Sequence, residues 1–124
     1  MCGIAGLFCF ASSASVDKDA LVRMRDTMIH RGPDGSGLWL SKDLRAGLAH
    51  RRLAIVDLSD AAAQPLCNED QTVWTTFNGE IYNHLALRED LVRAGHSFRT
   101  DHSDTEVIVH GYEQWGIDGL VKAI

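Results

Sequence analysis

Cysteine and proline are scarce in this sequence, whose 124 residues contain three cysteines and two prolines. The cysteines, Cys2, Cys9 and Cys67, have no CxxC spacing, so they predict neither a zinc motif nor a disulfide framework. An odd, sparse set of cysteines is typical of a reducing compartment, and we therefore predict a cytoplasmic protein. We also predict no metal and no cofactor in this chain.

Long apolar runs and basic clusters are absent as well. No apolar run approaches the roughly 20 residues that a membrane-spanning helix requires, and the N-terminus lacks the charged and apolar regions of a signal peptide. The formal net charge is −5 with no basic block, which argues against a nucleic-acid or anionic-membrane surface. With 45% hydrophobic and 23% charged residues, the composition is that of one globular domain or part of one.

The first six residues, Met1 to Gly6, hold the most informative cysteine. Removal of the initiator methionine would leave Cys2 with both a thiol and a free α-amine. An α-amine has a reference pKa of roughly 7.7–8.0, so Cys2 could act as a nucleophile with its own base. Gly3 and Gly6 would let the backbone approach a ligand closely. A small apolar cysteine in a buried strand explains the same residues, and both interpretations stay open here.

Apolar periodicity predicts a mixture of strands and helices. We expect strands over residues 3–10, 37–40, 46–50 and 73–77, and helices over residues 18–29, 84–94, 104–115 and 119–124. Asp17 is a suitable N-cap for the first helix and Gly95 a suitable C-terminal cap for the second. Ser103 and Glu106 match a capping box. Asp104 would favour the dipole of the helix that this box begins.

Three polar stretches interrupt the pattern. His30–Gly37 has three glycines and a proline, which is typical of a structured loop; without a Gly-Lys-Ser/Thr signature it is a weak phosphate-binding candidate. In His50–Asp57, Arg51 and Arg52 precede an apolar run. One of them could grip a buried carboxylate, or both could be solvated surface residues. Residues 58–70 are expected to form a long loop, and such loops are often functional.

Asn78 and Gly79 follow the strand predicted over residues 73–77. Asn-Gly is a strong signal for a simple hairpin turn. A glycine N–H beside an asparagine side-chain amide is also the kind of donor pair that forms an oxyanion hole. The two residues alone leave both interpretations open.

Six motifs in one order resemble a known family. They are Met1–Gly6, His30–Asp34, His50–Asp57, Gln64–Leu66, Asn78–Asn83 and Ser103–Glu106. Together they resemble the N-terminal glutaminase domain of glutamine-hydrolysing asparagine synthetases, a class II glutamine amidotransferase of the N-terminal-nucleophile (Ntn) hydrolase superfamily. The resemblance spans residues 1–124. The motif that begins at Asn78 favours this branch over the glucosamine-phosphate synthase and phosphoribosyl-pyrophosphate amidotransferase branches.

The resemblance implies catalytic roles for three residues. Cys2 would attack the side-chain amide carbon of glutamine, with its own amine as base. A thioester would form, ammonia would leave, and water would then release glutamate. Asn78 and Gly79 would donate to the oxyanion of the tetrahedral intermediate.

The resemblance also implies a set of glutamine-binding residues. Arg52 would bind the α-carboxylate of glutamine, whereas Arg51 stands where the family varies. Glu80 and Asp104 would bind the ammonium group. Backbone lining of the pocket would come from Leu53, Ile55 and Val56, and Asn78 and Gly79 would contact the substrate as well.

The fold that the resemblance implies is α+β, a four-layer αββα sandwich of two antiparallel sheets between helical layers. The family's domain is longer than residues 1–124, so we expect a partial domain here. We also expect an absent C-terminal synthetase domain that uses ATP and Mg²⁺ to make asparagine from aspartate and the released ammonia. The expected partners are glutamine and that domain. An exposed sheet edge would favour self-association, for example as a homodimer.

Two other interpretations remain open at this point. An amidotransferase domain of the same type could serve another acceptor, such as a sugar or glycan precursor. The same fold could also be a non-catalytic glutamine-binding module. The residues that select the ammonia acceptor would lie outside residues 1–124, so this sequence does not distinguish between the possible acceptors.

Overall fold

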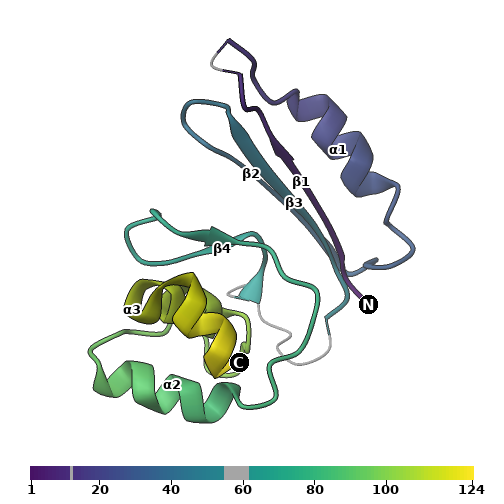
Figure 1. Cartoon of the computed structure of the whole chain (residues 1–124). Helices are drawn as coiled ribbons and strands as arrows, with labels where there is room; N and C mark the ends of the chain where they lie inside the picture. The colour runs from purple at the N-terminus through teal and green to yellow at the C-terminus, as the bar shows by residue number, and fades with distance from the viewer. Residues whose placement is uncertain (12, 55–61) are drawn as a thin grey trace. The chain divides into compact units, whose positions relative to one another are not determined.

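The chain folds into two compact units, here called unit 1 and unit 2. The computed structural model describes residues 1–11, 13–54 and 62–124. Unit 1 comprises Met1–Ile55, Ala63–Pro65 and Thr76–Asn78, and unit 2 comprises Val56–Ala62, Leu66–Thr75 and Gly79–Ile124. Each unit contains one antiparallel sheet with helix packed on it (Figure 1). The units are described separately below.

Unit 1 is a three-stranded antiparallel sheet covered by one helix. The strands are β1 (Gly3–Phe8), β2 (Gly35–Leu40) and β3 (Ala46–Arg52), and they lie in the order β1-β3-β2. Helix α1 (Lys18–Asp26) packs on β1 and β3 and runs along the sheet in Figure 1. The central strand β3 therefore has a strand on each side and a helix over one face.

Local signals explain how unit 1 is assembled. Asp17 caps α1 as predicted, because its Oδ1 accepts the N–H groups of Asp19 and Ala20 at 2.9 and 3.1 Å. Leu21 on α1 is fully buried in a core cluster with Val16 and Ala49, so the apolar stripe of the helix holds it against the sheet. The helix ends at Asp26, three residues earlier than predicted.

The ends of three strand segments meet in unit 1. Gly3, the first residue of β1, pairs with Arg51, and Gly35, the first residue of β2, pairs with Arg52. The start of β1 and the start of β2 therefore flank the C-terminal end of β3. The loop predicted over His30–Gly37 is shorter than expected, because its last residues pair with β3.

Unit 2 combines two short strands with two helices. They are β4 (Leu66–Cys67), β5 (Trp74–Thr75), α2 (His84–Arg93) and α3 (Glu106–Ala123). Helix α3 packs on α2 and on both strands. The loop predicted over residues 58–70 is wrong where β4 forms, and residues 58–61 lie outside the described residues. The strand predicted over residues 73–77 is shorter than expected, because only the two residues of β5 pair. A strand of two residues is too short for its ends to be read from the alternation of apolar and polar residues.

Two glycines end helices in unit 2 as the sequence predicted. Gly95 has a φ of 103°, and the N–H groups of Gly95 and His96 donate to the carbonyls of Val92 and Leu91, both at 3.0 Å. This is a Schellman motif, in which a left-handed residue closes the helix. Gly116 has a φ of 66° and interrupts α3, which confirms the break predicted between the last two helical segments.

The predicted capping box at the start of α3 is wrong. The N-cap is Thr105, which makes no side-chain capping bond, and the helix begins at Glu106. The Glu106 carboxylate instead accepts the backbone N–H groups of Arg99 and Thr100, at 2.7 and 2.9 Å. Because Glu106 is only 1% exposed, it satisfies the buried backbone that precedes the helix rather than the helix end.

The α+β fold class is confirmed. The described residues form two antiparallel sheets and three helices. Each unit has one sheet with a helical layer packed on it. An αββα sandwich contains two such pairs of sheet and helical layer, so the two units are consistent with a partial Ntn-hydrolase fold. No helix among the described residues has the length and apolar character needed to cross a membrane.

Candidate functional site

The thiol of Cys2 lies beside the residue that follows β3 in unit 1. Its Sγ accepts the Leu53 N–H at 3.3 Å and lies 3.6 Å from the Leu53 carbonyl oxygen. Arg31 Nε donates to the Cys2 carbonyl at 3.1 Å, which fixes the backbone of the cysteine. The predicted nucleophile is therefore half-buried and in direct contact with Leu53, one of the predicted pocket residues.

Glycine at position 3 has a structural explanation. A Cβ on Gly3 would lie 2.8 Å from the Cβ of Met28, whereas a Cβ on Gly6 would make an ordinary contact of 3.6 Å with Leu48. The close approach at Gly3 is to the chain itself, just after α1. This packing holds the start of β1 against the turn that follows α1. Cys2, which directly precedes β1, therefore lies at the end of the sheet.

The His30–Asp34 motif holds the end of β3 in place. The Asp34 N–H donates to the Arg52 carbonyl, and Asp34 Oδ2 accepts the Ala54 N–H, both at 2.9 Å. Gly32 lies so close to β3 that a Cβ there would be 2.4 Å from the Arg51 carbonyl. The loop therefore packs against and hydrogen-bonds to the segment that contacts Cys2, and its role is structural.

The two arginines of the His50–Asp57 motif differ in environment. Arg51 is 8% exposed; its Nε donates to the Gly32 carbonyl at 3.1 Å, and its Nη1 lies 3.8 Å from Asp26 Oδ1. The surface interpretation is therefore wrong for Arg51, which joins β3 to the preceding loop. Arg52 is half-buried and directly precedes Leu53, so it lies at the strand end that holds Cys2.

Asn78 and Gly79 do not form a hairpin turn. The next element after them among the described residues is α2 and not a strand. The described glycines with positive φ are Gly95 and Gly116, so the type I′ geometry that an Asn-Gly hairpin requires is absent here. Asn78 and Gly79 are both exposed. Their role as oxyanion donors stays a prediction.

Asp104 positions the chain next to Glu80 in unit 2. Its Oδ2 accepts the Ile81 N–H at 2.9 Å, and its Oδ1 accepts the Thr105 hydroxyl at 3.2 Å. Asp104 is 8% exposed and lies just before the start of α3, whereas the sequence had placed it in the first turn of the helix. Each carboxylate oxygen has two lone pairs, so Asp104 retains capacity to accept bonds from a ligand.

The predicted site residues are divided between the units. Unit 1 contains Cys2, Arg52, Leu53 and Asn78, and unit 2 contains Gly79, Glu80 and Asp104. Ile55 and Val56 lie outside the described residues. Contacts within the units join Cys2 to Leu53, and Asp104 to the residue after Glu80.

The sequence gave no separate role to His50, which pairs with Ile4 of β1 and with Gly37 of β2. His50 is 1% exposed. Its pKa is lowered from 6.5 to about 4, mainly by burial, with the backbone of Phe77 opposing the shift and the charge of Arg52 adding to it.

Comparison with known families identifies the class of protein to which this fold belongs. A family model described as a glutamine amidotransferase domain matches residues 1–124. The chain therefore belongs to the glutamine amidotransferase family.

Curated relatives narrow the class to one branch. The chain is 49% identical to a probable glutamine-hydrolyzing asparagine synthetase of Dictyostelium discoideum, over 95% of this chain and 21% of that protein. It is 47% identical to asparagine synthetase 3 of Arabidopsis thaliana, over 94% of this chain and 19% of that protein. It is 44% identical to asparagine synthetase 1 of Bacillus subtilis, over 98% of this chain and 19% of that protein. The chain is thus homologous to asparagine synthetases, as its motifs predicted, and spans about one fifth of their length.

Proposed function

We propose that this domain hydrolyses glutamine to glutamate and ammonia with Cys2 as the nucleophile. Two observations support the proposal: the family match over residues 1–124 and the contact of Cys2 Sγ with Leu53 at the end of β3. The second supports the choice of residue, because it joins the Cys2 thiol to Leu53, one of the predicted pocket residues. Family membership alone would not choose among Cys2, Cys9 and Cys67.

The proposed reaction begins once Met1 has been removed. The free α-amine of Cys2 takes the thiol proton, and the sulfur attacks the side-chain amide carbon of glutamine. The C–N bond breaks, the nitrogen leaves as ammonia with the transferred proton, and a thioester remains on Cys2. Water then cleaves the C–S bond, which releases glutamate and restores the thiol.

The other predicted residues have complementary roles in this proposal. The Asn78 side chain and the Gly79 N–H donate to the oxyanion, which is charged only in the tetrahedral intermediates. Arg52 binds the α-carboxylate of glutamine through its planar fork. Glu80 and Asp104 bind the ammonium group, and Leu53, Ile55 and Val56 supply backbone lining.

We further propose that the ammonia serves asparagine synthesis in a longer protein. The relatives that support this are named glutamine-hydrolyzing asparagine synthetases, and this chain spans about one fifth of their length. ATP and Mg²⁺ would act in the synthetase part, and no step assigned to this chain uses them. Self-association of the domain stays a prediction, which sedimentation of the purified chain would test.

A glutamine-analogue electrophile tests the identity of the nucleophile. We expect mass spectrometry of the labelled protein to place the adduct on Cys2, and Cys2→Ala to abolish ammonia release from glutamine. Cys9→Ala is the matched control, because Cys9 is also half-buried in unit 1, and this variant should keep the activity. An adduct on Cys9 or Cys67 would overturn the proposal.

The mass of the N-terminus tests the proposed base. We expect Met1 to be absent from the active protein, so that Cys2 carries the free amine. An active protein that retains Met1 would contradict the proposal, because the amine of Cys2 would then be part of a peptide bond and could not accept the proton.

A further inference from the structure

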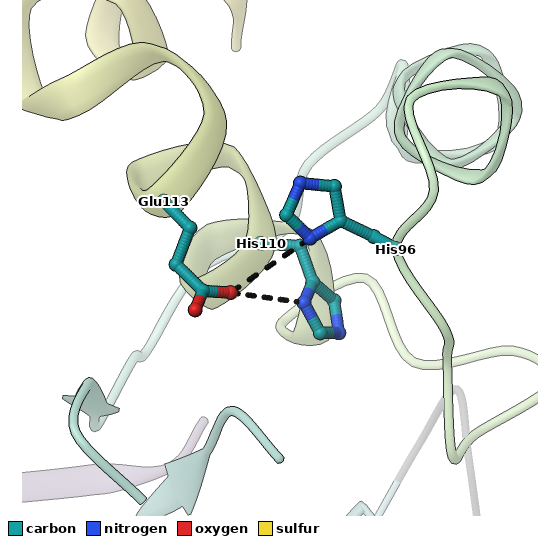
Figure 2. Close-up of side chains that lie close together, drawn as sticks. All are labelled: His96, His110 and Glu113. Atoms are coloured by element: carbon teal, nitrogen blue, oxygen red, sulfur yellow. Dashed lines mark hydrogen bonds and ion pairs between the residues drawn. The ribbon is translucent and has the colours of Figure 1, made fainter. Parts of the chain in front are cut away.

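Three side chains of unit 2 point their donor atoms at one another, and none of them belongs to the proposed glutaminase site. His96 follows the Schellman motif that ends α2, and His110 and Glu113 lie one turn apart on α3 (Figure 2). Glu113 Oε2 lies 3.4 Å from His110 Nδ1 and 3.8 Å from His96 Nδ1. All three donor atoms lie within 4.8 Å of one another.

The partner of the outer ring nitrogen favours an unprotonated Nδ1 on His96. His96 Nε2 lies 3.1 Å from the side-chain carbonyl Oε1 of Gln114, which can only accept, so Nε2 carries the hydrogen. On His110 it is Nδ1 that donates to Glu113 Oε2, at 3.4 Å, and Nε2 lies 3.6 Å from the buried carboxylate of Glu106, so a metal would replace the Nδ1 hydrogen. Metal-binding histidines usually donate the N–H of one ring nitrogen to a carbonyl or carboxylate, while the other ring nitrogen faces the metal.

Neighbouring side chains hold two of the three donors in place. Glu113 Oε1 accepts from Asn68 Nδ2 at 2.7 Å. The orientation of this amide is fixed, because Asn68 Oδ1 accepts the backbone N–H groups of Thr72 and Val73 at 2.9 and 3.0 Å. The ring of Phe98 packs edge-on against His110, with 4.6 Å between the ring centroids. These contacts position both the carboxylate ligand and the more buried histidine.

Glu69 supplies a fourth donor. Its Oε2 lies 3.9 Å from His110 Nδ1, and its side chain is 50% exposed, so it can move toward the cluster. His110 itself is 1% exposed. The cluster therefore has a buried side on α3 and a side open to solvent through which an ion could enter.

We propose that His96, His110 and Glu113, with Glu69 as the fourth ligand, form a binding site for a zinc-class divalent metal. Zn²⁺ bonds of about 2.0–2.1 Å in a tetrahedron place neighbouring ligand atoms roughly 3.3–3.4 Å apart. The His110–Glu113 separation of 3.4 Å already meets this value, whereas the 3.8 and 3.9 Å separations and the His96–His110 pair, which lies within 4.8 Å, need side-chain movements. Mixed imidazole and carboxylate donors suit Zn²⁺ rather than Ca²⁺ or Mg²⁺, which prefer oxygen alone.

The site is independent of the proposed glutamine chemistry. Its ligands lie in unit 2, and none of them is among the proposed glutamine-site residues of that unit, Gly79, Glu80 and Asp104. No step of thioester formation or hydrolysis uses it. The cysteine pattern could not reveal the site, because its donors are histidine and glutamate residues from three separate segments.

Calorimetric titration of the full chain with Zn²⁺ tests the proposal. The protein is first treated with a chelator, and its three cysteines are alkylated so that thiols cannot bind the metal. We expect one Zn²⁺ per chain, with binding weakened at least tenfold in His96→Ala and in Glu113→Gln. Glu113→Gln keeps an oxygen for Asn68, which protects the fold. Titration with Co²⁺ should give the visible absorption of a tetrahedral complex.

Two further variants sharpen the test. Gln114→Ala removes the partner of His96 Nε2 without removing a ligand, and it should weaken Zn²⁺ binding roughly tenfold. His102→Ala is the matched control, because His102 is an exposed histidine of the same unit, and its affinity should equal that of the wild type. Absence of saturable Zn²⁺ binding, or equal binding by the wild type, His96→Ala and Glu113→Gln, would overturn the proposal.

Discussion

Acidification from about pH 7 to about pH 5 should destabilise unit 1 through His50. Burial lowers the pKa of this histidine to about 4 in the folded chain, whereas the pKa in an unfolded chain is about 6.5. Between these values the unfolded state binds more protons than the folded state. The free energy of unfolding therefore falls as the pH falls through this window.

The size of the effect follows from the two pKa values. At about pH 7 His50 is mostly neutral in both states, so its contribution is small. At about pH 5 the unfolded state is mostly protonated and the folded state is mostly neutral, which lowers the free energy of unfolding by about 2 kcal/mol. Below both pKa values the loss approaches about 3 kcal/mol. Domains of this size are stable by roughly 5–15 kcal/mol, so the loss is measurable.

Urea unfolding followed by tryptophan fluorescence measures this contribution. We expect the wild type to lose about 2 kcal/mol more than His50→Gln between about pH 7 and about pH 5. His30→Gln is the matched control, because His30 is exposed in the same unit, and it should show the full wild-type loss. Equal losses in the wild type and His50→Gln would refute the reasoning.

The remaining predictions concern two site residues and one buried carboxylate. Arg52→Lys should raise KM for glutamine more than it lowers kcat, because an ammonium cannot replace the bidentate fork; an unchanged KM in steady-state assays would exclude Arg52 as the carboxylate ligand. Asn78→Ala should chiefly lower kcat, by about 10²–10³, and a change in KM alone would contradict the oxyanion role. Glu106→Gln should lower the free energy of unfolding near neutral pH by roughly 1.5–3 kcal/mol. Although burial alone would raise the pKa of Glu106, bonds with His110, Thr100 and Arg99 lower it to about 2, so the wild-type advantage should be present above about pH 4.5 and fade as the pH falls toward 2; a pH-independent difference in urea unfolding would argue against this.

Features that depend on neighbours in the sequence were predictable. Asp17 caps α1, Gly95 closes α2, and Gly116 interrupts α3, because each acts on backbone groups within a few residues. Cys2 and Leu53 were assigned to one site by motif resemblance rather than by local rules. Their contact joins residues that are 51 positions apart, and sequence periodicity alone contains no information about such a pair.

Features that depend on distant partners could not be predicted. Strand β4 has two residues and is stabilised by pairing with β5 and packing against α3, so it leaves no periodic signal. Arg51 was weighed as a surface residue because its partners, Gly32 and Asp26, come from the segment before β2. The division of the predicted site between two units likewise has no counterpart in the order of the motifs.

The failure of the capping box at Glu106 follows from a competition between local and distant partners. A capping box stabilises an exposed helix start, where water already satisfies part of the backbone. Glu106 is buried, and the N–H group of the buried Thr100 beside it would otherwise lack an acceptor, at about 1–3 kcal/mol. The buried carboxylate therefore accepts a donor that water cannot reach. In this arrangement Glu106 Oε1 lies 3.6 Å from His110 Nε2. The opposite ring nitrogen, Nδ1, faces Glu113 and the proposed metal site.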